Sequence, residues 1–342
     1  MFSLASGFHS FRKEGTVVRI GLLGASGIAP AAVIRPARRR SDASVVAVAA
    51  RSGQSAAAYA EKHDIERSYG SYRELLADPD IDLIYNALPP SEHAEWSIAA
   101  LRSGKDVLCE KPFAMNSAQV LRMNQAASDT GHRLIEAFHD RYHPLSLELD
   151  AVKASGRLGQ IQSLHGDFVY NNPFDALAIR HDPALGGGAL MDLGCYPLHW
   201  LRAFMNEEPE VIEAVATLNP MGADMGMDAT LRFAGGATGR VTASMHADAV
   251  PGSTLRVVGT SGTLLVENLV FPSAGHTIVE TIGGVDRERT VAGAATYDHQ
   301  LEAVIGALAS GMTLPTEGDD PVGNMAAIDA IYEAAGIRRP YE

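Results

Sequence analysis

The tripeptide Glu110-Lys111-Pro112 stands at the carboxyl end of a short, mostly apolar run, residues 106–110. Such a run predicts a buried parallel strand, and ligands of α/β proteins gather outside the carboxyl ends of these strands. Packing explains a lysine there poorly, because a buried ammonium is costly without a partner. The sequence therefore predicts that Lys111 takes part in chemistry at the edge of a parallel sheet.

A turn of small residues, Gly24-Ala25-Ser26-Gly27-Ile28, follows another apolar run at 17–23 and opens a helical stretch. Small residues let the backbone approach a pyrophosphate, and the following helix N-terminus offers N–H groups and a favourable dipole. Against the pattern G-x-G-x-x-G, the best register is Gly24-x-Ser26-x-x-Ala29. The strand–turn–helix context favours a dinucleotide site over the alternative, an ordinary tight turn.

The residues after the second apolar run, 45–50, indicate which dinucleotide binds. An acidic residue there would bond the ribose 2′-hydroxyl of NAD and reject a 2′-phosphate. This chain has Arg51 and Ser52 instead, and a guanidinium suits phosphate. We therefore expect NADP as the favoured cofactor and NAD as the other candidate. The alternative for Arg51 is a solvated side chain after a strand.

The elements that position these residues alternate in the first part of the chain. Apolar runs predict strands at 17–23, 45–50, 82–88 and 106–110, and helices are expected up to about residue 40 and over 56–63, 91–102 and 117–130. The last helix begins at Asn116 or Ser117 and ends at Gly131. This alternation predicts right-handed βαβ crossovers and one parallel sheet, a Rossmann NAD(P)-binding domain over 18–136.

The second part of the chain predicts a different architecture. Strands are expected at 160–170, 211–218, 229–233, 237–245, 254–258 and 263–266, with helices at 299–309 and 322–335. Several strands are joined by short glycine-rich links, which connect antiparallel neighbours. The fold class is therefore an α/β Rossmann domain followed by an α+β domain, 137–342, with a large, mostly antiparallel open sheet. Residues 1–17 are expected to form a flexible extension.

Composition limits the number of domains and the kinds of partner that can be expected. A chain of 342 residues with 46% hydrophobic residues has material for two globular domains. The formal charge of −13 argues against a nucleic-acid partner. The chain has no run of about 18 uncharged apolar residues, so no membrane partner is expected. Two cysteines, Cys109 and Cys195, are too few for a disulfide framework, and we expect a cytoplasmic protein.

Four further segments complete a family pattern: Ser71-Tyr72-Arg73-Glu74-Leu75-Leu76, residues 87–93, residues 186–197, and Tyr297-x-His299-Gln300. With the turn at Gly24 and Glu110-Lys111-Pro112, they make the chain resemble the glucose–fructose oxidoreductase, inositol dehydrogenase and rhizopine-catabolism (Gfo/Idh/MocA) family over about residues 18–336. Inositol-dehydrogenase-like members carry histidine where this chain has Tyr196. The tyrosine is more similar to the branch of dimeric dihydrodiol dehydrogenases and xylose dehydrogenases.

The resemblance implies an oxidoreductase that transfers a hydride between a nicotinamide and a carbinol or carbonyl carbon of a sugar, cyclic polyol or dihydrodiol. It implies catalytic roles for Lys111, Asp192 and Tyr196. The expected cofactor-binding residues are Gly24, Ala25, Ser26, Gly27, Ile28, Arg51, Ser52, Leu88, Pro89, His93, Glu110 and Lys111. Because family members commonly associate through the open sheet, a homodimer or homotetramer is expected.

Hydride transfer at a carbinol carbon needs a partner proton transfer at the oxygen. We expect the Lys111 ammonium to lower the pKa of Tyr196 from about 10 toward neutrality and to stabilise a developing alkoxide. Asp192 would share a helix face with Tyr196 and orient Lys111 or a sugar hydroxyl. Either Lys111 or Tyr196 is a candidate for the immediate proton carrier.

These assignments have structural alternatives. Asp192 could be only an N-cap, and Tyr196 only a core aromatic residue. His199 could reach the cleft or be a bonded structural histidine, and His93 could contact the nicotinamide or lie away from it. No spacing typical of a metal site is present, so no metal is expected.

A second class of function is a cofactor-binding regulator of the same fold that lacks turnover, and biliverdin-reductase-like chemistry is a third. An intact set of Lys111, Asp192 and Tyr196 favours the enzyme, because a regulator need not keep proton-handling residues.

Overall fold

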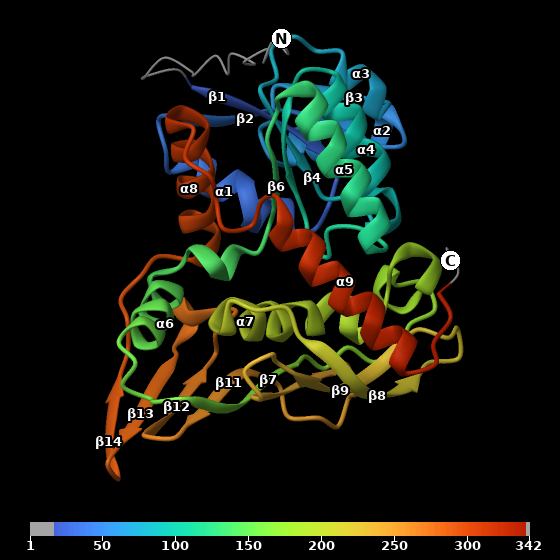
Figure 1. Cartoon of the computed structure of the whole chain (residues 1–342). Helices are drawn as coiled ribbons and strands as arrows, with labels where there is room; N and C mark the ends of the chain where they lie inside the picture. Colours follow the sequence, from blue (N-terminus) through green and yellow to red (C-terminus); the bar gives the residue numbers. More distant parts are fainter. Residues whose placement is uncertain (1–16, 340–342) are drawn as a thin grey trace, which may run out of the picture.

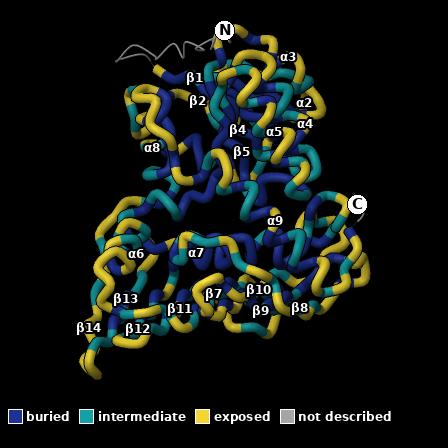
Figure 2. Tube along the Cα trace, viewed as in Figure 1, coloured by how far each residue is buried: buried dark blue, intermediate teal, exposed yellow. Residues whose placement is uncertain are grey.

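A computed structural model describes residues 17–339, so the predicted extension, except for Val17, lies outside the described residues. The chain forms two stacked parts, each built on its own sheet (Figure 1). Each part has a buried interior, as the dark segments of Figure 2 show. Among the described residues, no helix has the length and apolar character needed to cross a bilayer.

The first part is a six-stranded sheet in the order β3-β2-β1-β4-β5-β6, with every neighbouring pair parallel. Its strands are β1 (Val18–Leu23), β2 (Ala43–Ala49), β3 (Arg67–Tyr69), β4 (Leu83–Asn86), β5 (Asp106–Cys109) and β6 (Leu134–Glu136). Its helices are α1 (Arg35–Arg38), α2 (Gly53–Lys62), α3 (Tyr72–Leu76), α4 (Pro90–Arg102) and α5 (Ser117–Thr130). The predicted Rossmann arrangement is confirmed, although β3, α3 and β6 are too short to give a clear signal in the sequence.

The helix after β1 is irregular, as expected for a helical stretch that contains Pro30 and Pro36. A π-helical segment, Pro30–Ile34, leads into an α1 of only four residues. Pro30 and Pro36 lack the backbone N–H that would continue a regular ladder, which explains the irregularity. Helix α5 follows the prediction, because the Asn116 side chain accepts a hydrogen bond from the Gln119 amide and Gly131 ends the helix with a φ of 69°.

The second part is an eight-stranded sheet in the order β14-β13-β12-β11-β7-β10-β9-β8. Its strands are β7 (Ile161–Val169), β8 (Glu210–Leu218), β9 (Asp224–Arg232), β10 (Thr238–Ser244), β11 (Gly252–Gly259), β12 (Gly262–Glu267), β13 (Thr277–Ile282) and β14 (Val285–Arg289). Among the described strands of this sheet, only β7 and β10 pair in parallel. This confirms the predicted mostly antiparallel sheet and adds β13 and β14, which the sequence analysis did not identify.

Helices cover the face of this sheet that is turned toward the first part (Figure 1). They are α6 (Pro144–Ala154), α7 (Cys195–Met205) and α9 (Asp319–Ala334). Buried and less buried residues alternate along β7 and β9, as expected where one face packs and the other faces solvent. On the edge strand β8, Val215 is 69% exposed. Oligomerisation through this open face stays a prediction.

Helix α8 (Thr296–Ser310) corrects one assignment. The sequence analysis placed this segment in the domain 137–342, but Leu301, Val304 and Leu308 share a buried cluster with β1 and α1. In Figure 1, α8 accordingly stands beside the first sheet. The amphipathic pattern shows that the helix has an apolar face and does not show which sheet receives it.

Candidate active site

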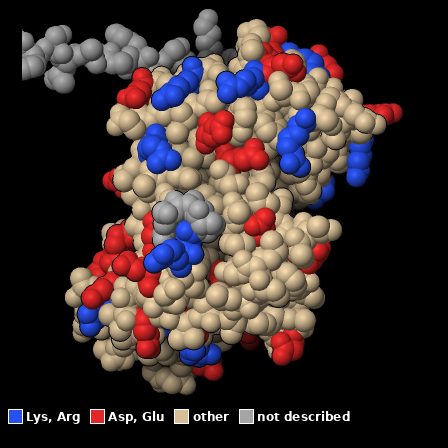
Figure 3. Space-filling view, turned by 90° about the vertical axis from the view of Figure 1, so that its right-hand side faces the viewer, with Lys and Arg blue, Asp and Glu red and all other residues tan. Residues whose placement is uncertain are grey.

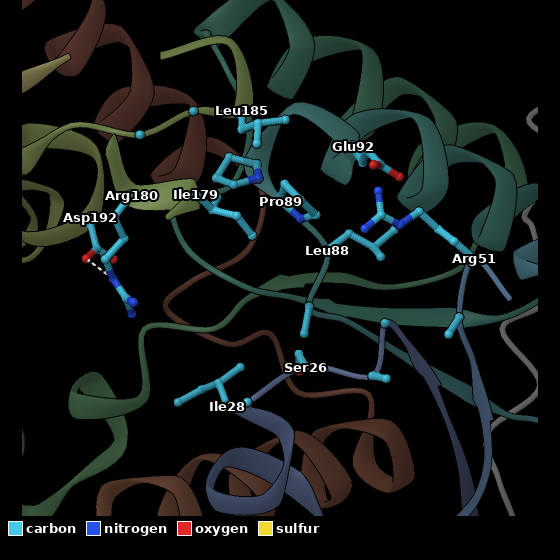
Figure 4. A pocket seen from close by; sticks show the side chains of 18 of the residues that line it. Ser26, Ile28, Arg51, Leu88, Pro89, Glu92, Ile179, Arg180, Leu185 and Asp192 are labelled. Atoms are coloured by element: carbon cyan, nitrogen blue, oxygen red, sulfur yellow. Dashed lines mark hydrogen bonds and ion pairs between the residues drawn. The ribbon is translucent and has the colours of Figure 1, made fainter. Parts of the chain in front are cut away.

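A cleft of about 1150 Å³ lies at the carboxyl ends of β1, β2, β4 and β5. Its walls come from the turn after β1, the start of α2, the loop into α4, the Lys111-Pro112 segment and residues 177–192 of the second part. Figure 4 shows Arg51 and Glu92 at one end and Asp192 and Arg180 at the other. The topology thus places the cleft where parallel sheets generally bind ligands.

The turn after β1 forms one wall of the cleft. Gly24 has a φ of 96°, and a Cβ there would lie 3.2 Å from Leu88 Cδ2, so this position favours glycine. In the described part of the chain, no acceptor contacts the backbone N–H groups of residues 25–28. Unpaired amides beside a helix start form an anion site. The turn therefore fits the pyrophosphate of a dinucleotide, and all five predicted residues, Gly24 to Ile28, line the cleft.

Arg51 and Ser52 lie at the far end of the cleft. Ser52 is the N-cap of α2, and its hydroxyl oxygen accepts a hydrogen bond from the Ser55 amide at 3.2 Å. Arg51 lines the cleft with an exposed side chain, and in Figure 4 its guanidinium points toward Glu92. Its contact with a 2′-phosphate stays a prediction.

Lys111 follows β5 and reaches the opposite end of the cleft. Its ammonium donates hydrogen bonds to the Asp192 carbonyl oxygen at 2.7 Å and to Asp192 Oδ1 at 2.9 Å. The side chain is only 13% exposed, and its peptide bond to Pro112 is cis. Burial alone lowers the pKa of Lys111, but the nearby acidic groups, with Asp192 foremost, raise it overall. Lys111 is therefore a fixed positive charge at neutral pH.

Asp192 joins the two parts of the molecule at this point. It lies within a π-helical segment, Leu190–Gly194, that leads into α7. Its second carboxylate oxygen accepts a hydrogen bond from Arg180 Nε at 2.6 Å. Burial raises the pKa of Asp192, but Lys111 and Arg180 more than offset this and hold it at about 2. The N-cap alternative is wrong, because Ala189 is the cap and the carboxylate faces two cations.

Tyr196 is placed near Lys111 but does not contact it through its hydroxyl. The Lys111 ammonium lies 5.0 Å from the centroid of the tyrosine ring. The hydroxyl is instead bonded to His139 Nε2 at 3.0 Å. Burial raises the pKa of Tyr196 well above its ordinary value. The expectation that Lys111 would lower this pKa is therefore wrong, because burial foremost, and then neighbouring groups such as Tyr297 and Asp140, raise it.

Two of the predicted cofactor-binding residues point away from the cleft. His93 is buried, and its ring nitrogens lie 2.8 Å from the Leu88 carbonyl oxygen and 3.0 Å from that of Pro112. Glu110 is also buried, and its carboxylate accepts a hydrogen bond from the Tyr85 hydroxyl at 2.6 Å. We infer that both hold the loops that carry Leu88, Pro89 and Lys111, all of which line the cleft.

His199 is a structural histidine. It is 1% exposed, lies 3.1 Å from Asp320 Oδ2 and stacks on Phe138 with ring centroids 4.4 Å apart. These contacts turn its ring away from the cleft toward α9. Among the described residues, no group of three or more His, Cys, Asp and Glu could hold a metal ion.

The sequence analysis missed Arg180 and His139. Arg180 lies in a short 3-10 helix, Ile179–His181, and its proximity to Asp192 becomes visible only in the folded chain. His139 follows β6 in a short 3-10 helix, His139–Tyr142. The only signal for either residue is position: Arg180 comes shortly before the glycine-rich motif, and His139 comes at the junction between the two parts.

The comparisons with known proteins agree with this architecture. Residues 18–138 match the profile of an oxidoreductase family with an NAD-binding Rossmann fold. Residues 147–265 match the profile of the GFO/IDH/MocA C-terminal domain. The class is therefore that of Rossmann-fold oxidoreductases, in which a nicotinamide dinucleotide serves as cofactor.

Curated relatives extend over most of the chain. D-xylose 1-dehydrogenase (NADP(+)) 2 of Haloferax volcanii is 34% identical, with 92% of this chain and 96% of that protein covered. Trans-1,2-dihydrobenzene-1,2-diol dehydrogenase of Xenopus laevis is 35% identical over 67% of this chain and 69% of that protein. The chain belongs to the Gfo/Idh/MocA family, and the predicted branch is confirmed.

A solved structure resembles this chain over most of its length. The 3-ketoreductase KijD10 of Actinomadura kijaniata, in complex with NADP and TDP-benzene, superposes with a TM-score of 0.86. It is 26% identical, with 93% of this chain and 98% of that chain covered.

Proposed function

We propose that this chain is an NADP-dependent oxidoreductase that interconverts a carbinol and a carbonyl carbon of a sugar, cyclic polyol or dihydrodiol. The observation that carries the proposal is the Lys111 ammonium, held by Asp192 at one end of a cleft whose other wall is an anion-binding turn. A charged lysine beside a dinucleotide turn supplies what reduction of a carbonyl needs at its oxygen.

The cofactor half of the proposal rests on the chain's own donors. The amides of residues 25–28 would bind the pyrophosphate, while Arg51 and Ser52 would bind the 2′-phosphate and thereby favour NADP over NAD. When bound, the nicotinamide donates or accepts the hydride. Both the xylose dehydrogenase and KijD10 are described with NADP, which supports this preference.

The proton half of the proposal rests on Lys111 and Tyr196. Lys111 would bind the substrate oxygen and stabilise negative charge as it develops there, since its own charge is fixed. Tyr196, whose raised pKa keeps the hydroxyl protonated before the reaction, would act as the hydrogen-bond donor and proton source for that oxygen. Asp192, held in turn by Arg180, keeps the ammonium in position.

The cleft and the relatives support the proposed substrate class. A carbinol beside Lys111 can belong to a sugar or a diol, and the relatives named above act on xylose and on a dihydrobenzene diol. The rim residues Leu177 and Ile179 add apolar surface to a cleft that otherwise carries charged groups at its ends. On the face drawn in Figure 3, acidic and basic side chains are interspersed, unlike a continuous basic surface for nucleic acid.

A substrate panel tests the proposal. Aldoses, inositols and trans-dihydrodiols would be offered with NADP and with NAD, and nicotinamide absorbance would report turnover. We expect turnover of at least one class, faster at low cofactor concentration with NADP. Tight NADP binding without turnover of any member would replace the enzyme with the second candidate, a cofactor-binding regulator.

A further inference from the structure

Tyr196 is the first of three buried side chains that are linked in series by hydrogen bonds. His139 Nε2 lies 3.0 Å from the Tyr196 hydroxyl, and His139 Nδ1 lies 2.7 Å from the Thr296 hydroxyl. The three residues come from the 3-10 helix after β6, from α7 and from the first turn of α8. All three are buried, with exposed fractions of 1–3%. Tyr196 and Thr296 are thus linked through one imidazole.

The imidazole is held in a fixed plane. Its ring centroid lies 4.1 Å from that of Tyr297 and 5.8 Å from that of Phe271. Burial, and then the charge of Lys111, lower the pKa of His139 to about 3. The ring is therefore neutral at physiological pH, with one nitrogen that donates and one that accepts.

A neutral imidazole between two hydroxyls has two complete hydrogen-bonding arrangements. In one, Thr296 donates to Nδ1 and Nε2–H donates to the Tyr196 oxygen, so that the tyrosine proton is left for another acceptor. In the other, Tyr196 donates to Nε2 and Nδ1–H donates to Thr296, so that the tyrosine oxygen presents only lone pairs. The tautomer of His139 thus decides what Tyr196 offers to a bound substrate.

We propose that His139 is a positioning residue for Tyr196, which sets whether the tyrosine hydroxyl presents a proton or a lone pair to the substrate oxygen. This inference rests on the proposed function. In carbonyl reduction, the carbonyl carbon gains the hydride that a reduced nicotinamide dinucleotide would supply, and its oxygen gains the Tyr196 proton. The phenolate left behind accepts a hydrogen bond from His139 Nε2–H, while the Lys111 ammonium lies over its ring. In oxidation, each transfer runs in the opposite direction.

Kinetics of substituted chains test the proposal. His139→Phe keeps a ring and removes both nitrogens, whereas Thr296→Val removes only the partner of Nδ1. We expect His139→Phe to lower kcat about tenfold or more, and Thr296→Val to lower it less, with the NADP Kd unchanged in both. The matched control is Thr316→Val, which removes a buried threonine hydroxyl that bonds to Tyr142 at 2.6 Å and to the Glu136 carbonyl oxygen at 2.8 Å. We expect it to change stability but not kcat.

A double-mutant cycle separates positioning from general destabilisation. If His139 acts through Tyr196, adding His139→Phe to Tyr196→Phe causes no further loss of kcat. Additive losses would overturn the inference. An impaired Tyr196→Phe beside a fully active His139→Phe would overturn this inference alone, whereas a fully active Tyr196→Phe would also overturn the role proposed above for the tyrosine.

Nitrogen-15 spectra of histidine-labelled protein provide a readout that needs no turnover. We expect the His139 resonances at neutral pH to be those of a neutral ring. They should shift at Nδ1 in Thr296→Val and at Nε2 in Tyr196→Phe, but not in Thr316→Val. A doubly protonated ring, or a ring insensitive to both substitutions, would overturn the proposal.

Discussion

At the end of the cleft nearest Arg51, the chain offers backbone amides and exposed side chains that have few partners within the protein. At the end nearest Asp192, the side chains are bonded to one another in the string Lys111–Asp192–Arg180, in which Lys111 and Asp192 are largely buried and Arg180 is exposed. The first end leaves hydrogen-bond donors available for the phosphates of a ligand. The second is built to hold charges and protons in place before a ligand arrives.

The two ends of the cleft should therefore respond differently to substitution. A change at the exposed end removes a ligand contact and leaves the protein intact, so it should alter binding. A change at the buried end removes a group from a network, so it should alter the chemical step, stability or both. Substitutions at each end test this difference.

Lys111→Met should have the largest effect. It keeps much of the side-chain length and removes the charge, so hydride transfer should fall by at least about 100-fold while NADP binding survives. Stopped-flow measurement of the chemical step, with cofactor binding followed by fluorescence, would check both parts. Equal losses in binding and turnover would mean that Lys111 serves mainly the cofactor.

Tyr196→Phe comes next. It deletes one oxygen and keeps the ring, so a proton-donating role predicts a loss in kcat of roughly 10–100-fold, with KM nearly unchanged. Because burial raises the tyrosine pKa, the wild-type pH profile should show no limb from this residue below about pH 10. A basic limb near neutrality that disappears in the variant would contradict a raised pKa for Tyr196.

Arg51→Ala tests the exposed end. Loss of a charge-assisted contact to the 2′-phosphate should weaken NADP binding by about ten- to a hundredfold. NAD binding, which lacks that phosphate, should hardly change. Isothermal titration with both cofactors gives the comparison, and Arg73→Ala, a nearby arginine that lies over the Trp96 ring and does not line the cleft, is the matched control. An equal loss for both cofactors would give Arg51 a structural role.

Asp192→Asn should have the smallest of these effects, measured as the change in the free energy of unfolding with pH. The folded-state pKa of Asp192, about 2, lies below its ordinary value of 3.8. Its charge therefore contributes about 2 kcal/mol above pH 5, and that contribution is lost as the pH falls toward 2. Urea unfolding of both proteins should show a difference at pH 5 that shrinks between about pH 4 and pH 2. A difference that does not change with pH would contradict the assignment.

Much of the cofactor end could be predicted from the sequence. The turn at Gly24 depends on a local backbone conformation that only glycine adopts easily, and the N-cap at Ser52 depends on residues three positions apart. Two residues that the sequence assigned to cofactor binding nevertheless point away from the cleft. His93 and Glu110 lie beside the cleft in sequence, but their side chains turn to Leu88, Pro112 and Tyr85. Chain position alone does not give the direction of a side chain.

By itself, the sequence determined the two sheets, the dinucleotide turn and the lysine at the end of β5, because strand periodicity, glycine conformation and capping are local properties. Only the tertiary structure decided which side chains meet at the other end of the cleft. Lys111 and Asp192 are 81 positions apart, and His139 is 57 from Tyr196 and 157 from Thr296. Contacts over such distances depend on how α7, α8 and the two sheets pack. The burial that results sets the pKa of Tyr196, which no local pattern encodes.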